Sequence, residues 1–183
     1  MNQQRKTFVV FDPSKGEIIG TYAVYDAGTR SYRTPTLEEA SNAFRDLLAE
    51  RKVDRIDILE ADLPIGTSHA GYRIDIERRQ LAMKPRIQVQ ADRTQIQGDG
   101  KDSVEIEISV VDDTSNVVES FNEELRVSTS RGHLSAPGGR IKAENGRAKI
   151  TLTSTIETVE HVGVFVRDPL ERSITGSISV EFL

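Results

Sequence analysis

The sequence contains no cysteine. It therefore has no disulfide framework, no thiolate metal site and no cysteine nucleophile. It also lacks an apolar run that approaches the roughly 20 residues of a membrane span. The apolar residues 8–11 are too short for the core of a signal peptide, and Asp12 and Pro13 end the run. As written, the chain is not exported by the usual secretory route, although a mature form with its signal removed stays open.

Excess positive charge is missing too, because the net charge is −5. A general nucleic-acid binder would need clustered Lys and Arg to neutralise phosphates, so we expect no nucleic-acid partner. The 37% apolar and 29% charged residues are typical of a soluble globular protein. Residues 1–85 hold 13 basic and 13 acidic side chains, whereas residues 86–183 hold 11 and 16. The charge difference favours a change of module near Pro85.

The first part of the chain predicts a β-hairpin. Residues 7–11 and 17–25 are both β-rich, and they flank a turn in which Pro13 presets φ and Gly16 supplies a positive φ. Residues 26–34 follow as a polar loop.

Residues 36–52 predict one helix. Thr36 can cap its first turn and Glu39 can reach back to the Thr36 amide, which is the capping-box pattern. Apolar residues at helical spacing then form one face: Leu37, Ala40, Phe44, Leu47 and Leu48. The alternating residues 53–59 and 72–76 predict two further strands.

These elements predict a small α+β module over residues 1–84, with the order β-β-α-β-β. The charged residues 77–84 are interpreted as the segment that joins it to the rest of the chain.

From Pro85 onward, short alternating runs recur between turn residues, and no helical pattern is present. About seven short strands in roughly 100 residues predict an all-β immunoglobulin-like sandwich over residues 85–183. The alternating apolar residues are Ile87, Val89 and Ala91; Val104, Ile106, Ile108 and Val110; Leu125 and Val127; Ala148, Ile150 and Leu152; Val162, Val164 and Val166; and Ile178, Val180 and Phe182.

This half resembles the group 1 bacterial Ig-like domains found in invasin- and intimin-type adhesins. The resemblance covers residues 87–183 and is carried by four runs, namely 91–92 with 98–113, 125–129, 130–135 and Asn145-Gly146 through Ser154. It implies a rigid spacer or adhesive module with no catalytic residues of its own; the family also occurs in surface and phage structural proteins. Residues 114–124 depart from the family pattern, since they form a longer, acidic connection in place of a short turn.

No catalytic, cofactor-binding or metal-ligating residue is predicted, so we expect no enzyme and no cofactor. His69, His133 and His161 show no metal-ligand spacing. Residues 98–102 lack the EF-hand pattern, and residues 135–140 lack the ending of a phosphate loop. An enzymatic alternative would use the loop at residues 63–71, with Asp57, Asp62 and His69 converging on a pocket.

Six residues are candidates for a contact surface, because tyrosine and arginine are favoured in protein interfaces: Tyr22, Tyr25, Tyr32, Arg73, Arg78 and Arg79. The alternative is that the tyrosines pack the small N-terminal core and that the arginines lie on a solvated strand face or at an interface with the negative second module.

The leading hypothesis is a non-enzymatic structural protein of a phage or virus-like particle, made in the cytoplasm and assembled with other copies of itself. The alternative is an exported bacterial surface adhesin module that binds a receptor or glycan. Neither hypothesis involves nucleic acid or membrane insertion.

Overall fold

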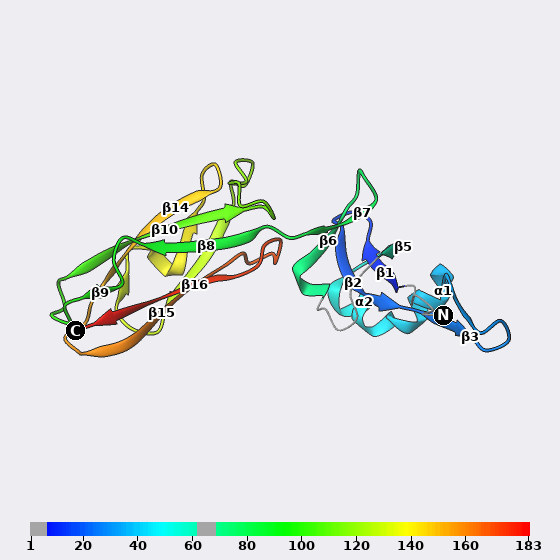
Figure 1. Ribbon diagram of the computed structural model, residues 1–183, viewed down its shortest axis with the longest axis horizontal. Coiled ribbons are helices and arrows are strands. Elements are labelled where there is room, and N and C mark those ends of the chain that lie inside the picture. Colours follow the sequence, from blue (N-terminus) through cyan, green and yellow to red (C-terminus); the bar gives the residue numbers. More distant parts are fainter. Residues whose placement is uncertain (1–6, 62–68) are drawn as a thin grey trace. The chain divides into compact units, whose positions relative to one another are not determined.

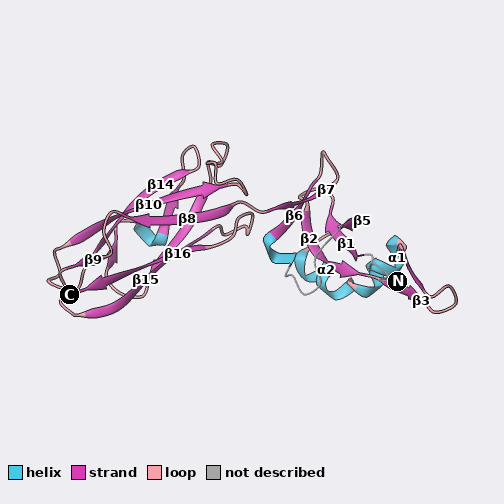
Figure 2. Ribbon diagram, viewed as in Figure 1, coloured by secondary structure: helices cyan, strands magenta, loops and turns pink. Residues whose placement is uncertain are grey.

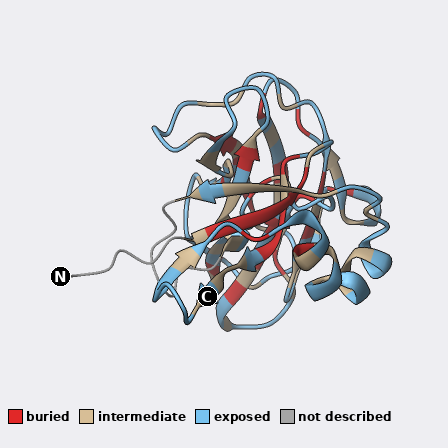
Figure 3. Cartoon of the chain, turned by 90° about the vertical axis from the view of Figure 1, so that its right-hand side faces the viewer, coloured by how far each residue is buried: buried red, intermediate tan, exposed pale blue. Residues whose placement is uncertain are grey.

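The computed structural model describes residues 7–61 and 69–183, and the chain divides into one compact unit that ends at Met83 and another from Lys84 to Leu183 (Figure 1). Strands predominate in both units (Figure 2). Buried residues follow the strands, whereas most connecting loops are exposed (Figure 3).

The N-terminal unit is built on a three-stranded antiparallel sheet with the order β2-β1-β5. Its strands are β1 (Thr7–Asp12), β2 (Glu17–Tyr22) and β5 (Asp57–Ala61). Both faces of β1 are covered. On one face, Val9 and Phe11 pack with Ile74 of β6 (Tyr72–Asp75), which pairs with β7 (Gln80–Met83). On the other, Gly20 lies against the ring of Phe44 between the helices.

The predicted helix over residues 36–52 is two helices, α1 (Leu37–Ala43) and α2 (Arg45–Arg51). Thr36 and Glu39 form the capping box at the start of α1. The backbone leaves the helical region at Phe44, and this break places the Phe44 ring against Gly20 and Tyr22. Packing of one aromatic side chain on the sheet thus outweighs the continuous helical pattern.

Two segments that we expected to be irregular contain hairpins. Residues 26–34 were predicted as a loop, but β3 (Val24–Asp26) pairs with β4 (Ser31–Arg33). The Asp26 carboxylate accepts hydrogen bonds from the Gly28 and Thr29 amides, so polar residues build the turn. The segment 77–84 was predicted as a linker, but β7 occupies half of it and the N-terminal unit extends to Met83.

The predicted loop at residues 63–71 lies largely outside the described residues. Its last three residues form the short 3-10 helix η1 (His69–Gly71).

The C-terminal unit is a two-sheet β-sandwich, which confirms the immunoglobulin-like architecture expected from the alternating strands. One sheet has the order β12-β14-β10-β8 and the other the order β13-β11-β15-β16-β9. The bounds are β8 (Arg86–Ala91), β9 (Gln95–Ile96), β10 (Ser103–Val111), β11 (Glu124–Thr129), β12 (His133–Leu134), β13 (Arg140–Lys142), β14 (Arg147–Thr153), β15 (Val159–Arg167) and β16 (Gly176–Phe182).

The core lies between these two sheets and consists of the inward residues of the alternating runs. Leu125, Leu152 and Phe182 are among its fully buried members. Period-two alternation explains this arrangement, because successive side chains of a strand point to opposite faces. The same rule places every second residue of β11, β15 and β16 on the outer face of the five-stranded sheet.

Hydrogen bonds hold the long acidic connection at residues 114–124 against the sandwich. The Asp112 carboxylate accepts hydrogen bonds from the Thr114 and Asn116 amides, and the Val118 amide donates to the Val110 carbonyl. Asn145 and Gly146 form the following tight turn, with φ values of 49° and 73°. A Cβ on Gly146 would lie 2.5 Å from the Val118 oxygen, so glycine allows the connection to pass close to this turn.

Candidate functional site

The six residues predicted as a contact surface do not come together. Tyr25 and Tyr32 pair edge to face across the β3–β4 hairpin, with ring centroids 5.3 Å apart. Tyr22 packs instead against Phe44, with centroids 6.2 Å apart. The tyrosines therefore divide between an exposed hairpin pair and a packed residue, since Tyr25 is 53% exposed.

The arginines lie on the β6–β7 hairpin, at the opposite end of the N-terminal unit from β3 (Figure 1). Arg73 is on β6, where it faces Ala82. Arg79 forms an ion pair with Asp57 at 3.0 Å, and the Arg78 guanidinium lies 3.9 Å from the Asp75 carboxylate. Two of the three charges are thus partly neutralised within the unit.

The carboxylates of the turn at residues 98–102 accept hydrogen bonds from backbone amides. Asp99 accepts hydrogen bonds from the Asp102 and Lys101 amides, which lowers the pKa of its carboxyl group. Asp102 accepts from the Gln97 amide. Across residues 7–61 and 69–183, no three histidine, aspartate or glutamate side chains gather so as to hold a metal ion. Of the alternative enzymatic residues, Asp57 pairs with Arg79, and Asp62 lies outside the described residues.

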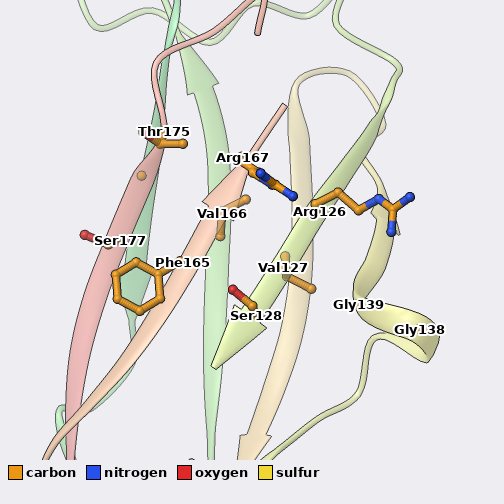
Figure 4. Close-up of a pocket in the computed structure, with 11 residues that line it drawn as sticks. Arg126, Val127, Ser128, Gly138, Gly139, Phe165, Val166, Arg167, Thr175 and Ser177 are labelled. Carbon is orange, nitrogen blue, oxygen red and sulfur yellow. The ribbon is translucent and has the colours of Figure 1, made fainter. Parts of the chain in front are cut away.

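A hollow of about 380 Å³ lies on the outer face of the five-stranded sheet (Figure 4). Side chains from the neighbouring strands β11, β15 and β16 line it, together with the short 3-10 helix η2 (Pro137–Gly139). Its lining includes Arg126, Ser128, Gly139, Phe165, Arg167 and Ser177. We refer to this hollow as the outer groove.

Phe165 supplies the apolar part of the outer groove. Its side chain is 54% exposed, although it stands on a central strand of the sheet. The register places Ser128 on one side of it and Ser177 on the other. Because both neighbours are small, the flank of the ring stays open, and the ring leans back over Gly163 on its own strand.

Arginines form the next cross-strand row. Arg140 of β13 lies opposite Arg126 of β11, which in turn lies opposite Arg167 of β15. Arg126 and Arg167 line the outer groove, and Arg140 continues the row beyond it. Glu124 lies 3.7 Å from both Arg126 and Arg140. Like charges directly opposite each other destabilise a sheet, so this row has an electrostatic cost.

The end of β15 next to the outer groove is held by a buried carboxylate. Asp168 accepts hydrogen bonds from the Leu170 amide and from the Arg172 guanidinium. Burial by itself would raise the pKa of Asp168, but the hydrogen bonds from Arg172 and from the Leu170 amide, together with the charge of Arg172, outweigh it, and the pKa lies below its ordinary value. Arg172 also lies over the Phe121 ring at 5.4 Å, so the β15–β16 loop is tied to the connection before β11.

Sequence reasoning did not find the outer groove. Arg126 and Arg167 each stand between buried residues of an alternating strand, so the pattern does predict that their side chains face outward. Cross-strand register, which places them opposite each other, is not visible in the sequence of one chain.

The fold and the groove together define a two-unit protein with an immunoglobulin-like sandwich and an open, cationic and aromatic sheet face. Its lining contains no histidine, carboxylate or cysteine, so the hydroxyls of Ser128, Thr175 and Ser177 have no general base beside them within the groove. No helix in the described residues is both long enough and apolar enough to cross a bilayer.

Neither a protein-family model nor a curated protein matches the chain. Solved structures do, and they include intimin, an adhesin of the class that the C-terminal sequence resembles. A C-terminal 282-residue fragment of intimin, solved in complex with the intimin-binding domain of its translocated receptor Tir, is 28% identical over 51% of this chain, with a TM-score of 0.41. The D0-D1 domain of intimin is 23% identical over 71% of the chain, with a TM-score of 0.42.

A glycosyl hydrolase family 2 member from Bacteroides cellulosilyticus matches 98% of the chain at 14% identity, with a TM-score of 0.51. The chain spans 31% of the intimin fragment and 22% of the hydrolase. At 14% identity, the likeness to the hydrolase extends to the fold alone.

Proposed function

We propose that the chain is a non-enzymatic binding protein of the surface-adhesin type, which contacts a protein partner through the outer groove of its immunoglobulin-like unit. The observation that carries the proposal is the exposed phenyl ring of Phe165 beside Arg126 and Arg167 on a rigid sheet. Aromatic residues and arginine are the side chains most enriched at the energetic centres of protein interfaces. The proposal rests on this groove and on the resemblance of the C-terminal sequence to adhesin domains.

A protein receptor is the partner class that we infer. The intimin fragment is described in complex with such a receptor, the intimin-binding domain of Tir. The phage-particle hypothesis gains no support from the fold, the groove or the comparisons, so we do not carry it further. The groove lining has serine and threonine hydroxyls but no histidine or carboxylate that could act as their general base, which favours binding without catalysis.

The test is a binding screen with the full chain immobilised on a biosensor, against purified host cell-surface and matrix proteins. Each protein that binds is then measured against Phe165→Ser and against Ile156→Ser. Ile156 is 84% exposed and is absent from the groove lining, so its replacement is a matched loss of exposed apolar surface.

We expect Phe165→Ser to weaken binding about tenfold or more, because it removes a central aromatic contact. Ile156→Ser should leave binding within about twofold. Equal affinities of the two variants for every bound protein would contradict the proposal.

A further inference from the structure

The arginine row has fewer carboxylates than guanidinium groups. On the outer face of the other sheet, by contrast, Lys149 lies 2.8 Å from the carboxylates of both Glu105 and Glu107, so this cation has more than one carboxylate partner. The row Arg140–Arg126–Arg167 has one carboxylate, Glu124, for three guanidinium groups. The row is therefore positive in a unit whose overall charge is negative.

Arg167 is the least neutralised member of the row. Within the described part of the chain, its guanidinium has no ion pair, whereas Arg126 and Arg140 share Glu124. Arg167 also lies on the same strand face as Phe165, two residues further along β15. An exposed cation and an exposed phenyl ring thus stand side by side on a strand fixed at its end by Asp168.

We propose that the outer groove binds an acidic polypeptide segment, with a carboxylate on Arg167 and Arg126 and a neighbouring apolar side chain on Phe165. This deepens the proposed function, on which it rests, by naming the chemistry of the partner. Arginine is suited to carboxylates because its planar donors bind both oxygens at once. A bound carboxylate also relieves the repulsion between the facing arginines.

The spacing of the groove matches an extended peptide. Residues two apart in a strand are about 7 Å apart, so Arg167 and Phe165 have the separation of positions i and i+2 of a partner segment. A segment that runs along β15 therefore presents an acidic side chain to Arg167 and its second neighbour to Phe165. Adjacent strands lie about 4.8 Å apart, which brings Arg126 within reach of the same carboxylate.

A polypeptide fits the groove better than an acidic glycan. The groove offers donors from Arg126 and Arg167 together with an apolar ring, which suits a carboxylate beside an aliphatic side chain. Sugar hydroxyls need fixed acceptors as well as donors, and the side-chain acceptors in the lining are the rotatable hydroxyls of Ser128, Thr175 and Ser177, with no carboxylate or carboxamide.

The experiment measures fluorescence polarisation of labelled peptides with the full chain. The probe is a glycine-flanked Glu-Ser-Leu-Ser-Glu peptide, and its neutral counterpart has Gln at both Glu positions. We expect the acidic peptide to bind about tenfold more tightly, because hydrogen bonds from arginine to a charged carboxylate contribute more than those to a neutral carboxamide. Binding should weaken between 50 and 300 mM salt, since exposed charges are screened over about 10 Å near 0.1 M.

Arg167→Gln should remove most of this preference, whereas Arg147→Gln should retain it. Arg147 is an exposed arginine on β14 of the other sheet, so it is a matched control. Circular dichroism of both variants verifies that the fold is retained. Equal binding of the two peptides, or equal binding by both variants, would overturn the acidic-segment inference.

An acidic glycan, represented by oligogalacturonate, is the competing ligand. If it binds through Arg167 more tightly than the acidic peptide, the polypeptide assignment is wrong. A result that contradicts the acidic-segment inference can be distinguished from one that contradicts the proposed function. A receptor that needs Phe165 but is indifferent to Arg167→Gln leaves the proposed function standing, whereas indifference to Phe165→Ser removes it.

Discussion

Gly163 and Phe165 stand two residues apart on the same face of β15, and the Phe165 ring occupies the space that a side chain at position 163 would fill. A Cβ on Gly163 would lie 2.8 Å from the ring. The glycine therefore sets the orientation of the one large apolar side chain in the outer groove. Gly20 in the N-terminal unit has a similar relationship to Phe44, with a Cβ 2.6 Å from that ring.

The two glycines predict different outcomes for the same substitution. Gly163→Ala should change the free energy of unfolding by less than about 0.5 kcal/mol, because the exposed Phe165 ring can swing into solvent. Gly20→Ala should destabilise by about 1–3 kcal/mol, because Phe44 is confined between the sheet and Tyr22. Urea unfolding followed by circular dichroism measures both values. Similar costs would show that Phe165 is as confined as Phe44.

The arginine row predicts that stability and binding change in opposite directions. Arg167→Glu would place a carboxylate directly opposite Arg126, which converts a repulsive cross-strand pair into an attractive one. We expect a gain of about 0.2–1 kcal/mol in unfolding free energy, together with loss of the acidic-peptide binding. Chemical denaturation and polarisation on one protein preparation test both parts. A destabilised variant would mean that the row is not under electrostatic strain.

We expect the contribution of Asp168 to the free energy of unfolding to depend on pH. Burial raises the pKa of this carboxyl group, but hydrogen bonds from Arg172 and the Leu170 amide bring it below its ordinary value in the folded chain. The stabilisation is then complete above the unfolded-state pKa of about 4 and is lost as the pH falls through the lower folded value.

Asp168→Asn should cost about 2 kcal/mol at pH 7. The difference from the unmodified chain should shrink below about pH 4. Denaturant unfolding at a series of pH values measures it, and a difference that is constant from pH 7 to pH 2 would contradict the ionised Asp168–Arg172 pair.

We expect Glu39, the acidic residue of the capping box, to titrate at an unusually low pH. Hydrogen bonds from Arg33 and from the Thr36 amide lower the pKa of Glu39 to about 2. The carboxylate should therefore stay ionised, and the cap intact, until the pH falls through about 2. Carbon-detected NMR of the Glu39 carboxyl group follows this titration.

Arg33→Gln should move the Glu39 midpoint upward, and Arg45→Gln on the next helix should leave it in place. Arg45 bonds to Asn42 and not to Glu39. A midpoint near 4.5 in the unmodified chain would show that the Arg33 contact does not persist in solution.

The sequence was most informative where one physical rule dominates. Period-two alternation predicted the inward residues of the sandwich, and Val104, Ile106, Ile108 and Val110 are all buried. The Thr36 capping box formed because it needs only residues close in sequence. Local patterns and burial patterns are sufficient for such elements.

The rest depended on contacts that are remote in sequence. The helix breaks at Phe44 because that ring packs on Gly20, 24 positions earlier in the printed sequence. The outer groove depends on the register of Arg126 with Arg167, which belong to strands separated by the whole β12–β14 segment. A single chain contains no signal for such pairings beyond the alternation itself.

The edges of the sandwich have a consequence for crowded conditions. Three of its four edge strands, β9, β12 and β13, are only two or three residues long. The fourth, β8, has its first residues hydrogen-bonded to Ile174. Long unpaired edges are the templates on which sheets of different molecules fuse into aggregates. Because these edge strands are so short, copies of this unit held at high density can contact one another through their sheet faces without their strands pairing into a continuous intermolecular sheet.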